Sequence, residues 1–485
     1  MSIFIGNFFL GMNLRINPVK TRGFTTKNNF VLRSCFTIFA TILCSCFTTV
    51  TEQPDEFNPS AEDSAFSGYQ VRSYFNGRAG MEWKVVYGSG SLKEDKSYFY
   101  ESPSSMQLIA LDTESTVIEK ILNPTQNVCG DIFVSVKLMA SSRANLSGVR
   151  FLTISLIGGK NYLDDASYSF HQPVRDTQVT DPGQWSRVNM VLNMFKISPT
   201  FDCRNISRVR IRLSAQPGFR DTLNFGELAF YPSPLQKAAL IITEDDQWAD
   251  FDTNGLPVMR KYGFPGTIYA NCGLLGDTRK MSLERLKTLQ DSGGWTIANH
   301  MWLHDTITNL TDDSAARSLQ HNSEFMQANG LRGFRYFAYP YGLFDRAKDS
   351  VVRANSESAR LVLGWPEGEA LPYPDRYRLR VIGFLDNKVT VKMAKSVLRQ
   401  IIENKTAGIL GVHEIVTSGP LDSRKWLRED WETTMDYVKD LVDEEKLTVY
   451  SLEDYMNHVQ AYATQVPRRV AAKASVQSQA DLPKQ

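Results

Sequence analysis

Histidine and cysteine are scarce in this sequence, since each occurs six times in 485 residues. An excess of one charge is also lacking, because 54 basic and 53 acidic residues leave a formal net charge of +1. This balance gives no electrostatic reason to predict nucleic-acid binding, so we expect no nucleic-acid partner. The remaining composition, 42% hydrophobic and 22% charged, is ordinary for a globular protein. The length predicts two or three domains at roughly 100–200 residues each.

The N-terminus has the composition of a targeting segment. A stretch with basic and no acidic residues leads into the apolar run Cys35–Leu43, which is too short to span a bilayer and is typical of a secretion signal. The run ends in Leu43-Cys44-Ser45-Cys46, which resembles a bacterial lipobox. That resemblance implies a signal peptide over 1–45, a lipid on Cys46, and an exported lipoprotein anchored to a membrane in the periplasm or at the cell surface. A plain cleaved signal and an uncleaved anchor are the alternatives.

Removal of the first 45 residues changes the formal charge from +1 to −4, because five basic groups are lost. Residues 46–66 are rich in Thr, Pro, Glu and Ser and predict a flexible tether. Disulfides form outside the cytosol. Cys129 and Cys203 lie in one predicted domain and could pair there; two buried free thiols are the alternative.

Residues 67–233 show the period-two alternation of β-strands. Runs such as Asp131–Leu138, Phe151–Ile157 and Val209–Leu213 lie between turn residues, which predicts an all-β sandwich of two sheets. The layout resembles a jelly-roll carbohydrate-binding module in its pattern. Six aromatic residues are candidates for stacking on sugar rings, with a place in the core as the alternative for each: Trp83, Tyr98, Tyr100, Tyr162, Tyr168 and Trp185.

The pattern changes at Tyr231-Pro232-Ser233-Pro234, where two prolines in four residues mark a boundary. From 236 to 463, short apolar strands such as Ala238–Ile242 alternate with helical periodicity, which predicts a parallel α/β sheet or barrel. The clearest helical stretches are 282–289, 391–403 and 431–442. The polar residues 464–485 predict a disordered tail.

Two adjacent carboxylates, Asp245 and Asp246, follow the buried strand Leu240–Ile242. Active-site residues of α/β folds gather at the carboxyl ends of strands. Adjacent side chains can take different roles there, one binding a metal and the other acting as a base. A turn or a helix cap is the alternative.

Two of the few histidines, His300 and His304, are spaced four apart. On one face of a helical turn both imidazoles would reach the same ion. The alternative is a pair of surface histidines, which the neighbouring Trp302 disfavours.

Two further segments have candidate chemistry. In Phe337-Ala338-Tyr339-Pro340-Tyr341-Gly342, proline and glycine impose an unusual backbone path that could aim an N–H at a ligand; an ordinary aromatic turn is the alternative. His413 ends the apolar strand Ile409–Val412, where a structural role is the alternative.

The order and spacing of these motifs closely resemble the polysaccharide deacetylase family, carbohydrate esterase family four with its NodB-homology domain, over residues 236–463. The form of residues 337–342 resembles the subgroup of extracellular poly-N-acetylglucosamine deacetylases. The resemblance implies a multidomain protein in which the jelly-roll-like sandwich precedes a distorted (β/α) barrel.

The family's metal ligands fall on Asp246, His300 and His304, which implies a divalent ion. Zinc is the expected ion, with Co²⁺, Mn²⁺, Ni²⁺ or Fe²⁺ as alternatives. One carboxylate and two imidazoles leave coordination positions open, as a catalytic site requires. Water held there has a pKa lowered toward about 7.

The family's other roles fall on residues near these ligands. The resemblance implies Asp245 as general base, His413 as general acid, and the backbone N–H of Tyr341 as an oxyanion donor. Substrate-binding positions fall on Trp365, which would wall the acetyl pocket, and on Tyr339 and Pro340.

Several positions depart from the family pattern. Glu244 stands where an aromatic residue is usual, Ala338 replaces an arginine that orients the base, and Gly411 replaces a leucine of the acetate pocket. The acidic residue that tunes the histidine acid has no clean counterpart; the nearby candidates are Glu367, Glu369 and Asp375.

We therefore expect a metal-dependent hydrolase that removes acetyl groups from a polysaccharide, either N-acetyl groups of a GlcNAc-type polymer or O-acetyl groups of a hemicellulose-like glycan. The alternatives are a non-catalytic surface glycan-binding lipoprotein with a vestigial deacetylase domain, and an assembly factor for polysaccharide export. The acetylated polysaccharide and, through the lipid anchor, a membrane are the expected partners, and the sequence predicts no particular protein partner.

Overall fold

The computed structural model describes residues 72–465 apart from gaps at 77–82, 98–103, 112–114, 130–131, 141–148, 160, 172–182, 184, 234, 345, 372 and 374. The predicted signal peptide, Cys46 and the tether lie outside these residues, as does most of the predicted tail. None of the helices in the described part of the chain combines the length and the apolar character that crossing a bilayer demands.

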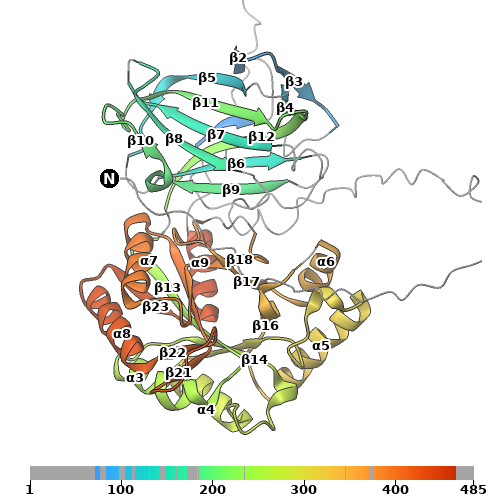
Figure 1. Cartoon of the computed structure of the whole chain (residues 1–485), viewed down its shortest axis with the longest axis vertical. Helices are drawn as coiled ribbons and strands as arrows, with labels where there is room; N and C mark the ends of the chain where they lie inside the picture. Colours follow the sequence, from blue (N-terminus) through green and yellow to red (C-terminus); the bar gives the residue numbers. More distant parts are fainter. Residues whose placement is uncertain are drawn as a thin grey trace, which may run out of the picture. The chain divides into compact units, whose positions relative to one another are not determined.

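Two six-stranded antiparallel sheets form the first half of the described chain (Figure 1). One has the order β3-β4-β12-β6-β9 with β1 on β12, built from β1 (Arg72–Asn76), β3 (Ser91–Asp95), β4 (Ser105–Leu111), β6 (Ile132–Met139), β9 (Ser186–Val191) and β12 (Arg220–Pro232). The other has the order β10-β8-β7-β11-β5-β2, built from β2 (Trp83–Tyr87), β5 (Ser115–Gln126), β7 (Val149–Ile157), β8 (Asp165–His171), β10 (Lys196–Ile197) and β11 (Ile206–Ala215). The predicted antiparallel sheets are confirmed, whereas the jelly-roll form stays a prediction.

Alternation along the strands builds the core between these sheets. On β11, Val209, Ile211 and Leu213 are buried in one cluster with residues of the other sheet such as Met106 and Leu108. Successive side chains on a strand point to opposite faces, so a period-two pattern places one apolar face inward. Trp83 belongs to this cluster at 3% exposure, so the interpretation of Trp83 as a core residue is confirmed.

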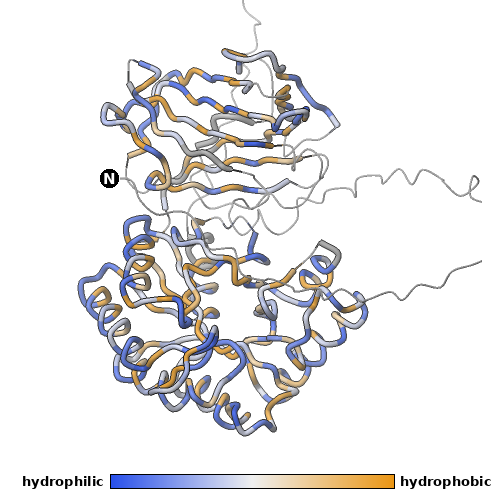
Figure 2. The backbone as a smooth tube through the Cα atoms, in the orientation of Figure 1, coloured by the Kyte–Doolittle hydropathy of each residue, from blue (hydrophilic) through white to orange (hydrophobic). Residues whose placement is uncertain are grey.

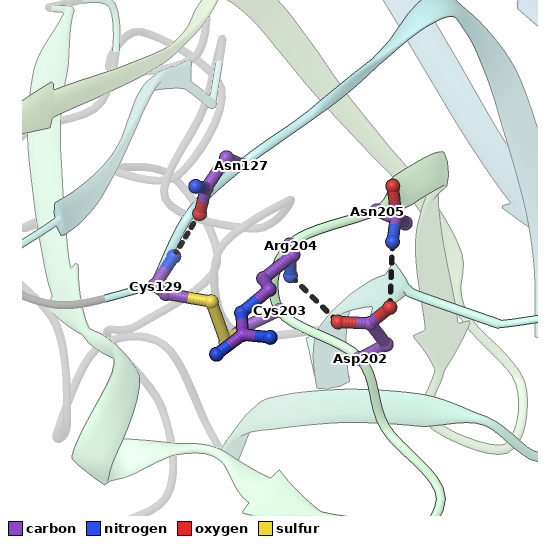
Figure 3. Close-up of a disulfide and its surroundings, with 6 residues drawn as sticks. All are labelled: Asn127, Cys129, Asp202, Cys203, Arg204 and Asn205. Atoms are coloured by element: carbon purple, nitrogen blue, oxygen red, sulfur yellow. Dashed lines mark hydrogen bonds between the residues drawn. A yellow bond between two sulfur atoms is a disulfide. The ribbon is translucent and has the colours of Figure 1, made fainter.

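A disulfide joins Cys129 to Cys203, with Cα atoms 5.0 Å apart (Figure 3). Cys129 follows β5 and Cys203 precedes β11, and the N–H of Val128 donates to the carbonyl of Cys203 at 2.8 Å. The alternative of two free thiols is therefore wrong for this pair. Cys272 is free and buried.

Nine strands from residue 238 onward form a parallel sheet with the order β18-β17-β16-β15-β14-β13-β20-β19, and β23 pairs with β13. The strands are β13 (Ala238–Asp245), β14 (Thr267–Ala270), β15 (Thr296–Asn299), β16 (Gly333–Ala338), β17 (Ser358–Gly364), β18 (Leu379–Val381), β19 (Gly383–Leu385), β20 (Ala407–Val412) and β23 (Leu447–Tyr450). The two end strands of this order, β18 and β19, are separated along the chain by Ile382 alone. The sheet is therefore a nearly closed barrel, as predicted.

Helices alternate with these strands. They are α3 (Leu256–Lys261), α4 (Leu283–Gly293), α5 (Asp312–Ala328), α6 (Arg346–Asn355), α7 (Val391–Asn404), α8 (Arg428–Asp443) and α9 (Leu452–Gln465). Ser282, Thr311 and Thr390 accept hydrogen bonds from backbone N–H groups at the starts of α4, α5 and α7, as N-cap residues do. The three predicted helices correspond to α4, α7 and α8 and are confirmed.

Both faces of strand β13 are buried, which explains its unbroken apolar run. Leu240 and Ile242 pack in a cluster with residues of the surrounding helices, whereas Ala239 and Ile241 pack in the cluster inside the barrel. Figure 2 shows the hydrophobic segments concentrated along the strands. Parallel strands buried on both faces lose the polar alternation seen in the sandwich.

Candidate metal centre and active site

Asp245 and Asp246 end strand β13 and face different partners. Asp246 and Gln247 have φ angles of 80° and 49°, in the left-handed region that L-residues adopt rarely. The N–H of Asp246 donates to the carbonyl of Tyr269 at 2.9 Å, which holds this turn against β14. The sharp turn separates the directions of two carboxylates that are adjacent in sequence.

His300 and His304 lie on an irregular loop after β15, so the expected helical turn is wrong. Met301 and His304 have φ angles of 67° and 60°. These two left-handed residues curl the loop so that the imidazole rings lie 4.9 Å apart, centroid to centroid. The two histidines, which are four residues apart, therefore converge because the loop between them is tight, and not because they share one face of a helix.

The three predicted ligands converge. Candidate ligand atoms of Asp246, His300 and His304 lie within 4.8 Å of one another. Asp246 Oδ1 is 3.8 Å from His300 Nε2 and 3.4 Å from His304 Nε2. Two imidazoles and one carboxylate, with positions left open, are the donor set of a catalytic zinc site.

His300 is held in the form that a metal requires. Its Nδ1 is 2.8 Å from the carbonyl oxygen of Ala338, so Nδ1 carries the hydrogen and Nε2 keeps its lone pair toward Asp246. Burial lowers the pKa of His300 to about 4. The ring is therefore neutral at physiological pH.

A buried network of amide side chains supports the ligand loops. Asn271 donates to the carbonyl of His300, while Gln247 exchanges two hydrogen bonds with the backbone of Asn271 at 2.8 and 2.9 Å. Asn299 accepts from the N–H of Met301 at 2.9 Å and from Asn322 of α5 at 2.8 Å. These bonds compensate the buried polar backbone of the irregular loop.

Arg360 is a site residue that sequence reasoning missed. It lies on β17, is fully buried, and its Nη2 is 2.5 and 2.6 Å from the two carboxylate oxygens of Asp245. Burial acts to raise the pKa of Asp245, but the guanidinium and the nearby His300 and His413 outweigh it and lower the pKa. The available signal was an arginine within the apolar strand Ser358–Gly364.

His413 follows β20, which pairs in parallel with β13 and so brings its end beside Asp245. Burial lowers the pKa of His413, while Asp245 and Asp246 act to raise it. Its ring lies 4.6 Å from that of Phe384. The pairing of β20 with β13, in which Val412 lies opposite Glu244, places this distant histidine at the same end of the barrel as Asp245 and Asp246.

Tyr341 occupies the strained loop after β16. Its φ is 60°, its side chain is 61% exposed, and its ring lies 4.5 Å from that of His304. Gly342 follows at φ 64°, and a Cβ there would stand 2.1 Å from Cγ2 of Val362. Only glycine fits this close approach, which places Tyr341 beside the ligands.

Residues 233–356 match the family model described as polysaccharide deacetylase. By this match, residues 233–356 are identified as a polysaccharide deacetylase domain. It is similar to the poly-beta-1,6-N-acetyl-D-glucosamine N-deacetylase of Staphylococcus epidermidis, at 25% identity over 158 residues, which are 30% of this chain and 53% of the relative. The corresponding Staphylococcus aureus protein is 23% identical over 146 residues, 27% of this chain and 50% of the relative. The chain thus spans about half the length of the curated relatives it matches.

Solved structures also resemble parts of this chain. The family 4 carbohydrate esterase from Streptomyces lividans in complex with acetate has a TM-score of 0.32 at 13% identity, covering 44% of this chain and 92% of its own. The family 4 acetyl xylan esterase from Clostridium thermocellum in complex with a cobalt ion has a TM-score of 0.33 at 14% identity, covering 47% and 93%. At these TM-scores, the evidence for the fold remains the strand order of the chain itself.

Gly411 stands where the family pattern has a leucine, and the ring of Phe384 fills the space beside it. At Gly411 a Cβ would stand 2.4 Å from ring atoms of Phe384, which lies opposite it on β19. Phe384 also contacts the His413 ring and lies 5.8 Å from the Arg360 guanidinium. An aromatic ring from the neighbouring strand thus replaces the aliphatic side chain, and Phe384 is a second missed site residue.

The candidate acids for tuning His413 have other partners. Glu369 forms a buried ion pair with Arg380 at 2.7 Å, and Asp375 pairs with Arg353 at 2.7 Å. The structure brings neither to His413 and records no carboxylate contact of Glu367 with it. Nδ1 of His413 has no hydrogen-bond partner among the described residues.

Glu244 is fully buried on the helix side of β13, and its Oε1 accepts from the N–H of Trp248 at 2.8 Å. Burial raises the pKa of Glu244 well above its usual range. The hydrogen bond to Trp248 braces the turn that contains Asp246.

The three residues expected to bind substrate lie in different surroundings. Tyr339 and Pro340 are buried, and Tyr339 packs on Phe337 at 5.0 Å, so these two support the loop from beneath. Trp365 is half-buried, with its ring under the Arg380 guanidinium at 3.8 Å. A place for Trp365 at the acetyl pocket stays a prediction.

Proposed function

We propose that this chain is a metal-dependent hydrolase that removes acetyl groups from an N-acetylated polysaccharide. The observation that supports it most strongly is the convergence of Asp246, His300 and His304 within 4.8 Å, with Asp245 adjacent. The relatives named as poly-beta-1,6-N-acetyl-D-glucosamine N-deacetylases favour a GlcNAc polymer as substrate. O-acetyl groups of a hemicellulose-like glycan need the same side chains and are the second substrate class.

The three ligand side chains fit a divalent ion, and we propose zinc. Nε2 of His300 is directed by the Nδ1 contact to Ala338, and both imidazoles approach Asp246. An ion bound there would polarise the acetyl carbonyl and lower the pKa of water it coordinates.

Asp245 and His413 divide the proton transfers. Asp245 takes a proton from the attacking water as that oxygen bonds to the acetyl carbon. The Arg360 ion pair keeps Asp245 ionised and fixes its direction. His413 then donates a proton to the leaving nitrogen as the carbon–nitrogen bond breaks, which yields acetate and a free amine.

The loop of Tyr341 contributes to carbonyl recognition. Its left-handed backbone and its contact with His304 place it next to the ligands. We assign its N–H to the oxyanion, where a single donor contributes roughly 3–4 kcal/mol in comparable sites.

For the intact protein we propose an exported lipoprotein with lipid on Cys46, because the apolar run and the Leu43-Cys44-Ser45-Cys46 sequence have that form. The Cys129–Cys203 disulfide supports a location outside a reducing compartment.

Acetate release from GlcNAc oligomers, acetyl-xylan and peptidoglycan tests this proposal, with zinc added to purified residues 47–485. We expect release by the wild type and loss of both zinc and activity in Asp246→Ala. Asp245→Asn should lose activity yet keep zinc, because Asp245 is paired with Arg360. A wild type that binds no metal and releases no acetate from any of the three would refute the proposal.

A further inference from the structure

Strand β11 presents a row of three arginines on the outer face of its sheet. Arg208, Arg210 and Arg212 alternate with Val209, Ile211 and Leu213, which are buried in the core. Side chains two residues apart point to the same face, at a spacing of roughly 7 Å along the strand. β11 lies between β7 and β5 in the middle of the sheet, so the row is central to this face.

Aromatic rings support these guanidinium groups. Arg210 and Arg208 lie 3.8 and 4.9 Å from the ring centroid of Tyr162, which is 51% exposed. Arg212 lies 5.3 Å from the ring of Phe151. A guanidinium stacked on a ring keeps its N–H edge free and ordered, ready for bidentate contact with a carboxylate or phosphate.

The row has fewer acidic neighbours than it has cations. Glu119 pairs with Arg210 at 2.7 Å, and burial raises the pKa of Asp165 while Lys196 and Arg210 act to lower it. Within the described residues, no ion pair is recorded for Arg208 or Arg212. Lys84 of β2 is exposed and lies opposite Glu119, which adds a further cation to the face. Like charges this close repel one another unless an anion compensates them.

We propose that this face of the sandwich binds an acidic polysaccharide, with Arg208 and Arg212 as its main contacts. Arg208 and Arg212, which are roughly 13 Å apart along the strand, suit a linear chain with an acid group in its repeating unit, because each of these two guanidinium groups can meet a separate acid group. This binding site is separate from the proposed deacetylation and does not depend on it.

The test uses the zinc-loaded full mature chain, and measures binding to polygalacturonate and to neutral dextran of similar length. We expect salt-sensitive binding to polygalacturonate and little to dextran. Arg208→Gln with Arg212→Gln should weaken binding at least tenfold at low salt. Arg210 is left intact because it pairs with Glu119. Tyr162→Ala, which keeps every charge, should weaken binding severalfold by releasing the stacked guanidinium groups.

A matched control variant has two arginines of the deacetylase domain replaced, Arg332→Gln and Arg335→Gln. The side chains of Arg332 and Arg335 are 55% and 52% exposed. This control variant has the same net charge as the double variant of β11 and should bind like the wild type. Equal losses in both double variants, or equal binding to dextran, would overturn the proposal. Binding to phosphatidylglycerol vesicles without binding to polygalacturonate would overturn it in favour of a lipid surface. Unchanged thermal unfolding midpoints show that the variants fold, and absence of acetate release would affect the proposed function alone.

Discussion

The Nη2 atom of Arg360 touches both carboxylate oxygens of Asp245, at 2.5 and 2.6 Å, and the two residues come from strands separated by three others in the barrel. Ala338 stands at the position where the family pattern has an arginine. A guanidinium from β17 supplies the charge from another direction. The barrel thus keeps a counter-charge for Asp245, the proposed base, although the sequence motif lacks it.

Replacement of Arg360 should change the pH dependence of catalysis. In Arg360→Gln the buried Asp245 loses the charge that opposes desolvation, so the pKa of Asp245 rises. The acidic limb of the kcat/KM profile should move to higher pH, and kcat should fall at least tenfold. Arg360→Lys should recover part of the shift, which distinguishes a charge effect from misfolding. A limb that stays in place in Arg360→Gln would show that Asp245 is not the base.

The metal-free protein should lose stability as the pH falls from about 6.5 to about 4. Burial lowers the pKa of His300 to about 4, whereas a histidine of the unfolded chain titrates near 6.5. Between these values the unfolded state binds a proton that the native state does not, so the free energy of unfolding decreases with falling pH. The His300 contribution is on the order of 3 kcal/mol at pH 4. Urea unfolding of chelator-treated protein at pH 7 and 4.5 measures it, and an identical pH dependence in His300→Gln would contradict the assignment.

Phe384 and Gly411 should behave as a coupled pair. Gly411→Leu alone should lower stability and activity, because its Cβ already meets the Phe384 ring at 2.4 Å. Phe384→Ala should lower activity by opening space beside His413. The double variant should recover part of both losses, with a coupling energy of about 1–3 kcal/mol by unfolding and by kcat/KM. If the effects of the two single substitutions simply add in the double variant, then the Phe384 ring does not take the place of a leucine side chain at position 411.

Asp221 of β12 should destabilise the sandwich at high pH. Its carboxylate is buried, neither oxygen has a hydrogen-bond partner among the described residues, and burial raises its pKa to about 7. The native state holds a proton that the unfolded state releases above its usual pKa near 3.9, so stability is lost as the pH rises from about 4 through 7. Asp221→Asn should raise the free energy of unfolding by about 1–3 kcal/mol at pH 8 and change it little at pH 4. Equal effects at both pH values would indicate a packing cause.

The motifs at strand ends were predictable because chemistry restricts the residue types. Asp246, His300, His304 and Asp245 could be named from residue type and order, and the barrel from alternation of apolar strands with helices. Arg360 and Phe384 could not, since Arg360 pairs with Asp245, 115 residues away along the chain, and Phe384 lies opposite Gly411 on another strand. Their roles depend on register across the sheet, which no local pattern encodes. The loop of His300 was mistaken for a helical turn because a spacing of four also fits a tight curl with two left-handed residues.

Five of the seven non-glycine residues with positive φ in the described chain lie at the metal end of the barrel: Asp246, Gln247, Met301, His304 and Tyr341. Each such conformation costs about 1–2 kcal/mol. These loops therefore store local free energy that the finished barrel, together with the proposed cation, must hold in place. Amide hydrogens around residues 246, 301 and 341 should exchange with solvent sooner than those of β13 or β20, and chelation should speed their exchange further. The catalytic geometry would then form last during folding and open first when the ion departs.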